Sequence, residues 1–275
     1  MAKSIPSPDE TDIVWTTIRA EVVEEAEREP ILAGFLHATI LKHVRLEDAL
    51  SFHLSNKLAT PTLEAMLIRE LIDETLSIHP EIGAAVRADV RAVRERDPAS
   101  RGYSEPFLFF KGFHAIECHR VAHSLWQQDR HALAIFLQNR ISETFGVDIH
   151  PAARLGSGIL MDHGTGIVIG ETAVVEDNVS MLHEVTLGGT GKEIGDRHPK
   201  IRHGVLIGAG AKVLGNVDVG AGAKIGAGSV VLDDVPSHTT VAGVPAKIVG
   251  RPEVAEPALE MNQRFPHSHA DGSGI

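Results

Sequence analysis

The sequence predicts an α+β protein in which an N-terminal all-helical domain precedes a left-handed parallel β-helix of hexapeptide repeats with an extruded loop. Apolar residues have helical spacing up to about Gly146. From Ile149 they recur at every sixth position instead, and one sixteen-residue gap interrupts this period. We therefore divide the chain into a helical oligomerisation domain at 1–147, a β-helix domain at 148–250 and a flexible tail at 251–275.

The composition of the 275 residues is that of an ordinary globular protein and argues against several classes. Cys118 is the single cysteine, so neither an internal disulfide nor a multi-cysteine zinc site is possible. The net charge of −11 argues against a nucleic-acid surface. No apolar run approaches the roughly 20 residues that cross a bilayer, and the N-terminus lacks the apolar segment of a secretion signal. We expect a cytoplasmic protein with no nucleic-acid or membrane partner.

The first half of the chain predicts packed amphipathic helices. Val14, Ile18 and Val22 recur at every fourth residue, and the apolar residues between 133 and 141 fall at i, i+3, i+4 and i+8. Thr60 followed by Pro61 is typical of a helix N-terminus. We interpret the histidines of this half as surface or packed core residues.

The six-residue period indicates triangular coils. Each hexapeptide supplies one short flat face and one corner, and three hexapeptides, about eighteen residues, close a coil. Small residues and glycine suit corners that turn sharply or take a positive φ. Repeats this tight wind left-handed in hexapeptide proteins, against the usual crossover preference. All thirteen positions expected to point inward are apolar: Ile149, Leu155, Met161, Ile167, Ala173, Val179, Val185, Ile201, Ile207, Val213, Val219, Ile225 and Val231.

The gap in the period lies between Val185 and Ile201, where sixteen residues replace six. Its sequence, VTLGGTGKEIGDRHPK, places glycines before a lysine, but Thr186 and Glu193 break the phosphate-binding P-loop pattern at two positions. Because the period resumes in phase, the ten additional residues predict a loop extruded from a corner, at about 191–200. Long loops on rigid scaffolds are often functional.

Polar residues gather where a solenoid scaffold does not need them. Asp148 and His163 are fifteen residues apart, slightly less than one coil, so we expect the carboxylate to orient the imidazole from an adjacent coil. An oriented histidine that accepts a proton from a hydroxyl is the minimal equipment for activating an alcohol. Asp162 precedes this histidine, and the extruded loop carries Arg197 and His198.

The motifs of the second half resemble those of the serine O-acetyltransferases, a family of hexapeptide-repeat enzymes. MDHGTG, GGTGK and GDRHPK carry the resemblance, together with KGFHAIECHRVAHSLW upstream and AGVPAKIVG downstream. The similarity runs from about residue 10 to 250. Gly164 stands where the family more often has alanine, and His203 where a different polar residue is expected.

The resemblance implies direct transfer of acetyl from acetyl-CoA to the hydroxyl of L-serine, giving O-acetyl-L-serine for cysteine biosynthesis. His163 would be the general base, Asp148 would hold its tautomer, and His198 would complete the catalytic set. No metal is expected. A covalent acetyl-cysteine route is not expected either, because Cys118 lies in the helical half.

The resemblance also implies how both substrates bind. Asp97 and Asp162 would receive the serine ammonium, while Arg197 and His198 would receive its carboxylate; opposite charges suit the two ends of a zwitterion. Acetyl-CoA would lie in a groove between neighbouring solenoids. The matching positions for CoA are Gly189, Thr190, Ala209, Ala227 and Lys247.

The resemblance further implies partners and regulation. Similar proteins form trimers through the solenoid, and two trimers meet through the helical domains as a homohexamer. L-cysteine would inhibit at the serine site. A free C-terminal Ile275 would enter the active site of cysteine synthase, a carboxylate-capture mode of binding.

Two alternatives stay open at this point. His198 and His203 have H-x4-H spacing with His163 about two coils back, which suits a three-histidine zinc site of a γ-type carbonic anhydrase on the same fold. Another hexapeptide acetyltransferase with a different hydroxyl acceptor is the second alternative. A non-enzymatic scaffold whose tail docks partners is a third interpretation.

Overall fold

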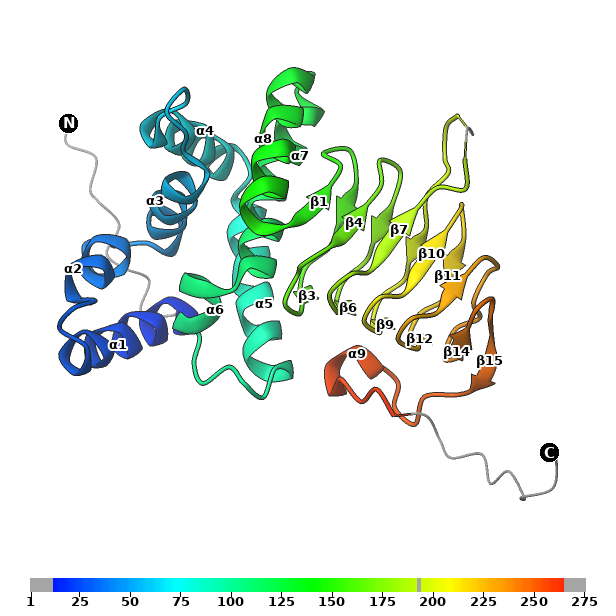
Figure 1. Ribbon diagram of the computed structural model, residues 1–275. Coiled ribbons are helices and arrows are strands. Elements are labelled where there is room, and N and C mark those ends of the chain that lie inside the picture. The colour runs from blue at the N-terminus through cyan, green and yellow to red at the C-terminus, as the bar shows by residue number, and fades with distance from the viewer. Residues whose placement is uncertain (1–11, 192–193, 265–275) are drawn as a thin grey trace.

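The computed structural model describes residues 12–191 and 194–264. The helices that precede residue 146 lie at one end of the molecule and the stacked β-strands at the other, as Figure 1 shows. The predicted fold class is confirmed, because a helical region is followed by a parallel β-solenoid. Within the described ranges no helix is long and apolar enough to cross a membrane.

The helical region ends two residues before the first strand. Its elements are α1 Ile13–Arg28, α2 Ala33–Leu36, the π-helical turn His37–Leu41, α3 Leu46–Leu58, α4 Ala65–Ile78, α5 Pro80–Arg96, α6 Ser104–Phe109, α7 Lys111–Gln127 and α8 His131–Phe145.

Helix α1 shows how apolar spacing becomes packing. Val14, Ile18 and Val22 lie on one side of the helix and are buried in the helical core. Asp12 caps the helix, because its side chain accepts a hydrogen bond from the backbone N–H of Trp15 at 3.1 Å.

The predicted helix start at Thr60 was wrong. The Thr60 hydroxyl oxygen accepts a hydrogen bond from the Leu63 N–H at 3.0 Å, which closes a turn. Helix α4 begins only at Ala65. Thr60 lies four residues before Glu64, the N-cap of this helix, so its hydroxyl closes the preceding turn and does not cap the helix.

Three sheets form the sides of the solenoid, and up to β13 consecutive strands belong to successive sheets. Sheet 1 has the order β1-β4-β7-β10-β13, sheet 2 has β2-β5-β8-β11, and sheet 3 has β3-β6-β9-β12-β14-β15. Only β15 is antiparallel to its neighbour among the paired strands. The bounds are β1 Val147–Ile149, β2 Arg154–Leu155, β3 Leu160–Met161, β4 Ile167–Ile169, β5 Val174–Val175, β6 Ser180–Met181, β7 Thr186–Gly188, β8 Lys200–Ile201, β9 Leu206–Ile207, β10 Lys212–Leu214, β11 Asp218–Val219, β12 Lys224–Ile225, β13 Val230–Val231, β14 Thr240–Gly243 and β15 Ala246–Gly250.

The coils differ in length, which corrects the predicted insertion. From β8 to β13, paired residues are eighteen positions apart. Ile149 pairs with Ile169, twenty positions later, and Val175 pairs with Ile201, twenty-six positions later. The ten additional residues are therefore divided: two belong to the first coil and eight to the coil that carries the loop. The described loop leaves the solenoid between β7 and β8 (Figure 1).

The two-residue insertion lies between β3 and β4. Met161 pairs with Met181, twenty positions later, whereas Ile169 pairs with Leu187, only eighteen positions later. The count of six missed this shift because Ile167 and Ile169 are both buried, so either register fills the interior.

The helical region covers the open edge of the first coil, where no preceding coil can satisfy the backbone. Side chains of α5 and α7 supply the missing hydrogen bonds. His123 Nδ1 donates to Pro151 O at 2.7 Å, His119 Nε2 to Ala153 O at 3.1 Å and Arg120 Nη2 to Gly156 O at 2.8 Å, while Asp89 Oδ1 accepts from the Ile159 N–H at 2.7 Å. These side chains join the two regions.

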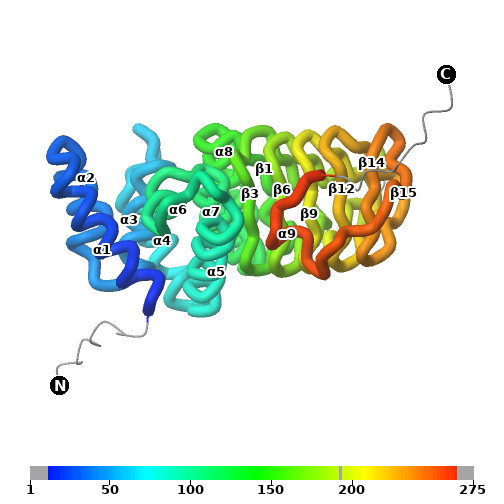
Figure 2. The backbone as a smooth tube through the Cα atoms, turned by 90° about the horizontal axis from the view of Figure 1, so that it is seen from below, coloured from blue at the N-terminus to red at the C-terminus, as the bar shows by residue number. Residues whose placement is uncertain are grey.

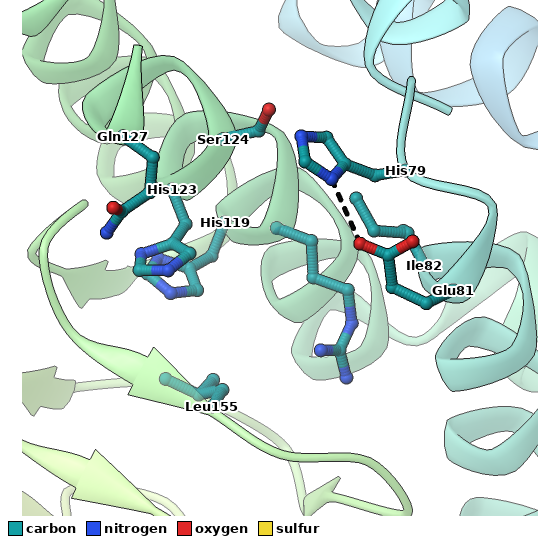
Figure 3. A pocket seen from close by; sticks show the side chains of 9 residues that line it. His79, Glu81, Ile82, His119, His123, Ser124, Gln127 and Leu155 are labelled. Carbon is teal, nitrogen blue, oxygen red and sulfur yellow. Dashed lines mark hydrogen bonds and ion pairs between the residues drawn. The ribbon is translucent and has the colours of Figure 1, made fainter. Parts of the chain in front are cut away.

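A cavity of about 260 Å³ lies beside this junction, between the start of α5, α7 and β2. Figure 3 shows His119 and His123 of α7 on one side of it and Leu155 of β2 below them. Leu155 is the one predicted inward residue that is only half-buried, because it borders this cavity. Burial lowers the pKa of His119 to about 3, so its ring stays neutral while it donates to the solenoid.

The residues after β15 turn back along sheet 3, where α9 Pro257–Glu260 lies over β6 and β9 (Figure 2). Ser180 Oγ donates to Ala258 O at 2.9 Å and accepts from Arg96 Nη1 at 3.1 Å, so one hydroxyl joins α5, β6 and α9. Residues 251–264 therefore differ from the flexible tail that we predicted. Residues 265–275 lie outside the described part.

We expect Arg120→Ala to lower the free energy of unfolding by about 3 kcal/mol, because it leaves two buried carboxylates without their cation. The Arg120 side chain is 9% exposed, and its partners Asp89 and Glu117 are fully buried. Chemical denaturation measures the loss. Arg28→Ala is the matched control, since its pair with Glu24 is exposed and contributes about 0.5 kcal/mol or less. Equal effects of the two substitutions would contradict this view of the junction.

Candidate functional site

The chain turns from sheet 3 into sheet 1 at residues 162–166, which we call the His163 corner. The two extra residues of the first coil lie here. His163 has a φ of 58°, and Gly164 and Gly166 have values of 71° and 73°. A positive φ also occurs at other corners of the solenoid, for example at Asn178 and Glu184, both 59°, so it belongs to the turn itself. The inserted pair of residues is what distinguishes the His163 corner.

The start of α7 supports the His163 corner. Gly112 leaves no room for a side chain, since a Cβ there would lie 2.1 Å from Met161 O. Lys111 Nζ donates a hydrogen bond to Thr165 Oγ1. The first residues of α7, a helix of the helical region, therefore support the His163 corner.

The His163 imidazole is 73% exposed and has few protein contacts. Its Nε2 lies 3.8 Å from Asp162 Oδ1, and its ring meets His183 of the next coil edge-on, with centroids 5.8 Å apart. The Asp148 carboxylate instead accepts a hydrogen bond from Gln138 Nε2 at 2.7 Å. In the described part of the chain no hydrogen bond joins Asp148 to His163, so that pairing stays a prediction.

The second group of candidate residues belongs to the turn from sheet 1 into sheet 2. We call residues 189–199 the Arg197 loop. Lys200 closes its base, because Nζ donates to Asp196 Oδ1 at 2.6 Å, to His198 O at 2.7 Å and to Thr172 O at 3.0 Å. The ion pair with Lys200 lowers the pKa of Asp196 below its usual value.

His198 is held in one orientation by the preceding coil. Its Nδ1 accepts hydrogen bonds from the Thr172 N–H at 3.2 Å and from Thr172 Oγ1 at 2.9 Å. The ring packs closely against Gly170, where an added Cβ would be 2.1 Å from Nε2. A Cβ on Gly189 would lie 3.7 Å from the same nitrogen. Burial, and then the charge of Arg197, lower the pKa of His198 below its usual value.

Arg197 is anchored at three points. Its Nη2 donates to Glu171 Oε2 at 2.5 Å, its Nη1 to Gly195 O at 3.1 Å, and its backbone N–H to Thr172 Oγ1 at 3.0 Å. The hydrogen bond from the Arg197 guanidinium lowers the pKa of the Glu171 carboxyl. The guanidinium side chain is still 26% exposed, so an anion can reach it.

The residues predicted to bind CoA are divided between the same two edges. Ala209 and Ala227 stand on successive coils at the edge that carries His163, and the Gly228 N–H donates to Ala209 O at 2.8 Å. Gly189 and Thr190 begin the Arg197 loop at the other edge. Lys247 is exposed on β15, at the far end of sheet 3.

One chain does not bring the two groups together. The His163 corner leads into β4 of sheet 1, and the Arg197 loop leaves β7 of the same sheet, so the two lie at opposite edges of sheet 1. A strand of three residues such as β7 spans about 10 Å, which is longer than a serine molecule. Asp97 is the C-cap residue of α5, and its Oδ1 accepts a hydrogen bond from the Ala99 N–H at 2.8 Å. Among the contacts of the described residues none joins Asp97 to Asp162, the other residue predicted to receive the serine ammonium.

The three histidines of the zinc alternative lie at three different corners. His163 stands between sheets 3 and 1, His198 between sheets 1 and 2, and His203 between sheets 2 and 3. Within 12–191 and 194–264 no group of three or more potential ligands has a geometry that could hold a metal ion.

Comparison with known proteins identifies the family of this chain. The family model "Bacterial transferase hexapeptide (six repeats)" matches residues 198–233, and "Serine acetyltransferase, N-terminal" matches residues 14–118. The chain is 58% identical to the serine acetyltransferase of Escherichia coli strain K12, over 98% of this chain and all of that protein. The chain belongs to the serine acetyltransferase family, and it is an acyltransferase.

Solved structures agree with this assignment. The serine acetyltransferase of Vibrio cholerae has a TM-score of 0.91 and 62% identity, covering 92% of this chain and 98% of its own. A serine acetyltransferase complex with cysteine has a TM-score of 0.90 and 58% identity, with the same coverage. The enzyme from Brucella abortus strain S19, in complex with coenzyme A, has a TM-score of 0.87 and 55% identity, covering 88% and 97%.

Sequence reasoning missed several residues that shape these two groups. His183 was not assigned a role from the sequence, yet its ring contacts His163 edge-on. Gly170, Glu171 and Thr172 were not singled out, because small and polar residues are ordinary at solenoid corners. The only available signal was their position one coil before the inserted loop.

We expect Gly170→Ala to reduce serine acetyltransferase activity at least tenfold at low serine concentration, because the new methyl group overlaps the His198 ring. Initial rates and circular dichroism are measured together. Gly34→Ala is the control, since a Cβ at Gly34 meets nothing within 4 Å. A Gly170→Ala enzyme with normal rates would show that the ring can move without loss.

Proposed function

We propose that the protein transfers the acetyl group of acetyl-CoA directly to the hydroxyl of L-serine, with His163 as general base. The observation that supports this most is the exposed His163 imidazole on a corner two residues longer than those above it, in a chain of this family. A neutral imidazole there is open to a hydroxyl approaching from outside the solenoid.

The chemistry needs one acyl transfer and two proton transfers. His163 takes the proton of the serine hydroxyl as its oxygen attacks the thioester carbonyl. When the C–S bond breaks, the imidazolium gives this proton to the leaving CoA sulfur, and neutral His163 is regenerated. Asp148 holds the imidazole tautomer in this proposal, and Asp162, 3.8 Å from Nε2, stabilises the imidazolium that forms. His198 stands with the substrate carboxylate.

A serine zwitterion needs contacts of opposite sign. Asp97 and Asp162 receive its ammonium, and Arg197 and His198 receive its carboxylate. Because the His163 corner and the Arg197 loop lie at opposite edges of sheet 1, we propose that each site forms between two copies. A trimer of solenoids provides three such contacts, and two trimers pair through their helical regions.

Acetyl-CoA occupies the same groove in this proposal. Ala209 and Ala227 line one wall from the first copy, and Gly189 and Thr190 line the other from its neighbour. Lys247 pairs with a phosphate of the cofactor. The related Brucella abortus structure contains coenzyme A, which supports a CoA site in this fold.

Direct transfer is supported by the state of Cys118. The thiol is 1% exposed in the helical core, and burial raises its pKa well above the usual value. A buried neutral thiol is a poor nucleophile. An acetyl-cysteine intermediate would have to form inside the helical core, where the thiol is buried.

We also propose that L-cysteine inhibits by occupying the serine site, since a related structure is a complex with cysteine. A cytoplasmic location and binding of cysteine synthase through Ile275 complete the proposal. Ile275 lies outside the described residues. Thiol release from acetyl-CoA, measured with L-serine and a panel of other hydroxyl acceptors, tests the reaction; equal rates with every acceptor would contradict it.

We expect His163→Ala to lower kcat by about 10² to 10⁴-fold, as for the loss of a general base. His203→Ala is the control, because His203 is exposed at another corner and should leave the rate unchanged. Zinc content is measured on the same samples. A stoichiometric metal lost together with activity in both variants would favour the carbonic anhydrase alternative instead.

A further inference from the structure

Three consecutive residues before β5 contact the two loop residues that would receive the substrate carboxylate. Gly170 accommodates the His198 ring, Glu171 pairs with Arg197, and Thr172 bonds to both. None of the three belongs to the inserted loop. They form a fixed surface one coil earlier on which the loop residues rest.

The Thr172 hydroxyl is fully used. Its oxygen accepts hydrogen bonds from the Arg197 N–H at 3.0 Å and from the His198 N–H at 3.1 Å. Both lone pairs are then occupied, so the hydroxyl has only its proton left to donate. His198 Nδ1 lies 2.9 Å away, and the hydroxyl also approaches the Asp196 carboxyl, whose pKa it helps to lower. The Thr172 backbone N–H donates to the same nitrogen at 3.2 Å.

This pattern decides the protonation of the imidazole. The Thr172 N–H donates to Nδ1 and the Thr172 hydroxyl lies beside it. This nitrogen therefore presents its one lone pair as acceptor and carries no proton. A neutral ring must then carry its proton on Nε2. The other neutral tautomer would direct a proton at two donors and would present a lone pair at Nε2, which repels a carboxylate.

We propose that Thr172 is a positioning residue, which fixes His198 as the Nε2–H tautomer so that this nitrogen donates to the carboxylate of the amino-acid substrate. The inference rests on the proposed function. In it, Thr172 determines whether the imidazole presents Nε2–H, which binds the substrate carboxylate, or a lone pair, which repels it. Thr172 acts through His198 and makes no contact with the substrate itself.

The charged groups around the ring support a neutral donor. Arg197 and Lys200 bring positive charge, Glu171 brings negative charge, and His150 faces the ring from the first coil. His150 also uses Nδ1 as an acceptor, from the Ala152 N–H at 3.1 Å. Because Arg197 and Lys200 already supply positive charge, the imidazole can stay neutral. Its Nε2–H then gives the substrate carboxylate a directional hydrogen bond, and Arg197 neutralises the carboxylate charge.

The test compares Thr172→Val with Thr172→Ser, which keeps the hydroxyl. Valine keeps the shape and the backbone N–H to Nδ1 but removes the hydroxyl, so that one donor instead of two favours the Nε2–H tautomer. We expect Thr172→Val to raise KM for L-serine about tenfold, as for a lost buried hydrogen bond with its partners left unpaired, and to leave KM for acetyl-CoA unchanged. Thr172→Ser should stay within about twofold of the parent enzyme.

The pH dependence of serine binding separates positioning from damage. Protonated imidazole carries a proton on both nitrogens, so acid restores the Nε2 donor whatever the tautomer. We therefore expect the loss of L-serine affinity in Thr172→Val, measured by calorimetry, to be smaller at pH 6 than at pH 8. A merely loosened loop would show the same loss at both pH values.

Several outcomes would overturn the inference. They are a Thr172→Val enzyme with normal serine affinity, a Thr172→Ser enzyme as impaired as Thr172→Val, and a loss that does not change with pH. A parent enzyme that releases no thiol in response to L-serine would contradict the proposed function itself. The two failures are thereby distinguishable.

Discussion

The requirement that each coil returns in register to the coil below governs the whole molecule. Paired strands leave no room for extra residues within a sheet, so additions to the eighteen-residue coil leave the solenoid at corners. This chain uses the freedom twice, with two residues at the His163 corner and eight at the Arg197 loop. The two additions carry the polar residues that the scaffold does not need, and sheet 1 lies between them. In the proposed function, each copy thus presents two half-sites, the His163 corner and the Arg197 loop, on two different edges.

The two half-sites are built in opposite ways. His163 is exposed, has a left-handed backbone and makes few contacts, which suits a group that must accept a proton from an incoming molecule. His198 and Arg197 are fixed by bonds to the coil before them, which suits groups that hold a carboxylate in one place. The helical region supports the first half-site through Lys111 and Gly112, and the same region satisfies the open edge of the first coil.

Much of the fold could be predicted from the sequence, because one aliphatic residue per hexapeptide is a direct record of the prism interior. The register of the first coil could not, since Ile167 and Ile169 both point inward and conceal a shift of two. Thr60 misled because a threonine before a proline suits a turn as well as a helix start. Residues 251–264 were expected to be flexible, but Pro257 and Ala258 are buried against the solenoid. The motifs identified His163, Arg197 and His198 as candidates. They gave no sign of Thr172, whose role depends on which coil lies beneath the loop.

The most direct test of a site shared between copies is to mix two inactive variants. His163→Ala and Arg197→Ala chains, each with its own affinity tag, are produced together, and oligomers that carry both tags are isolated. If the two residues act from different copies, each trimer that contains both variants joins an intact His163 to an intact Arg197 at one of its three contacts, and such trimers regain about a third of the parent activity. Mixed oligomers as inactive as either variant alone would contradict the account, because both residues would then act within one chain.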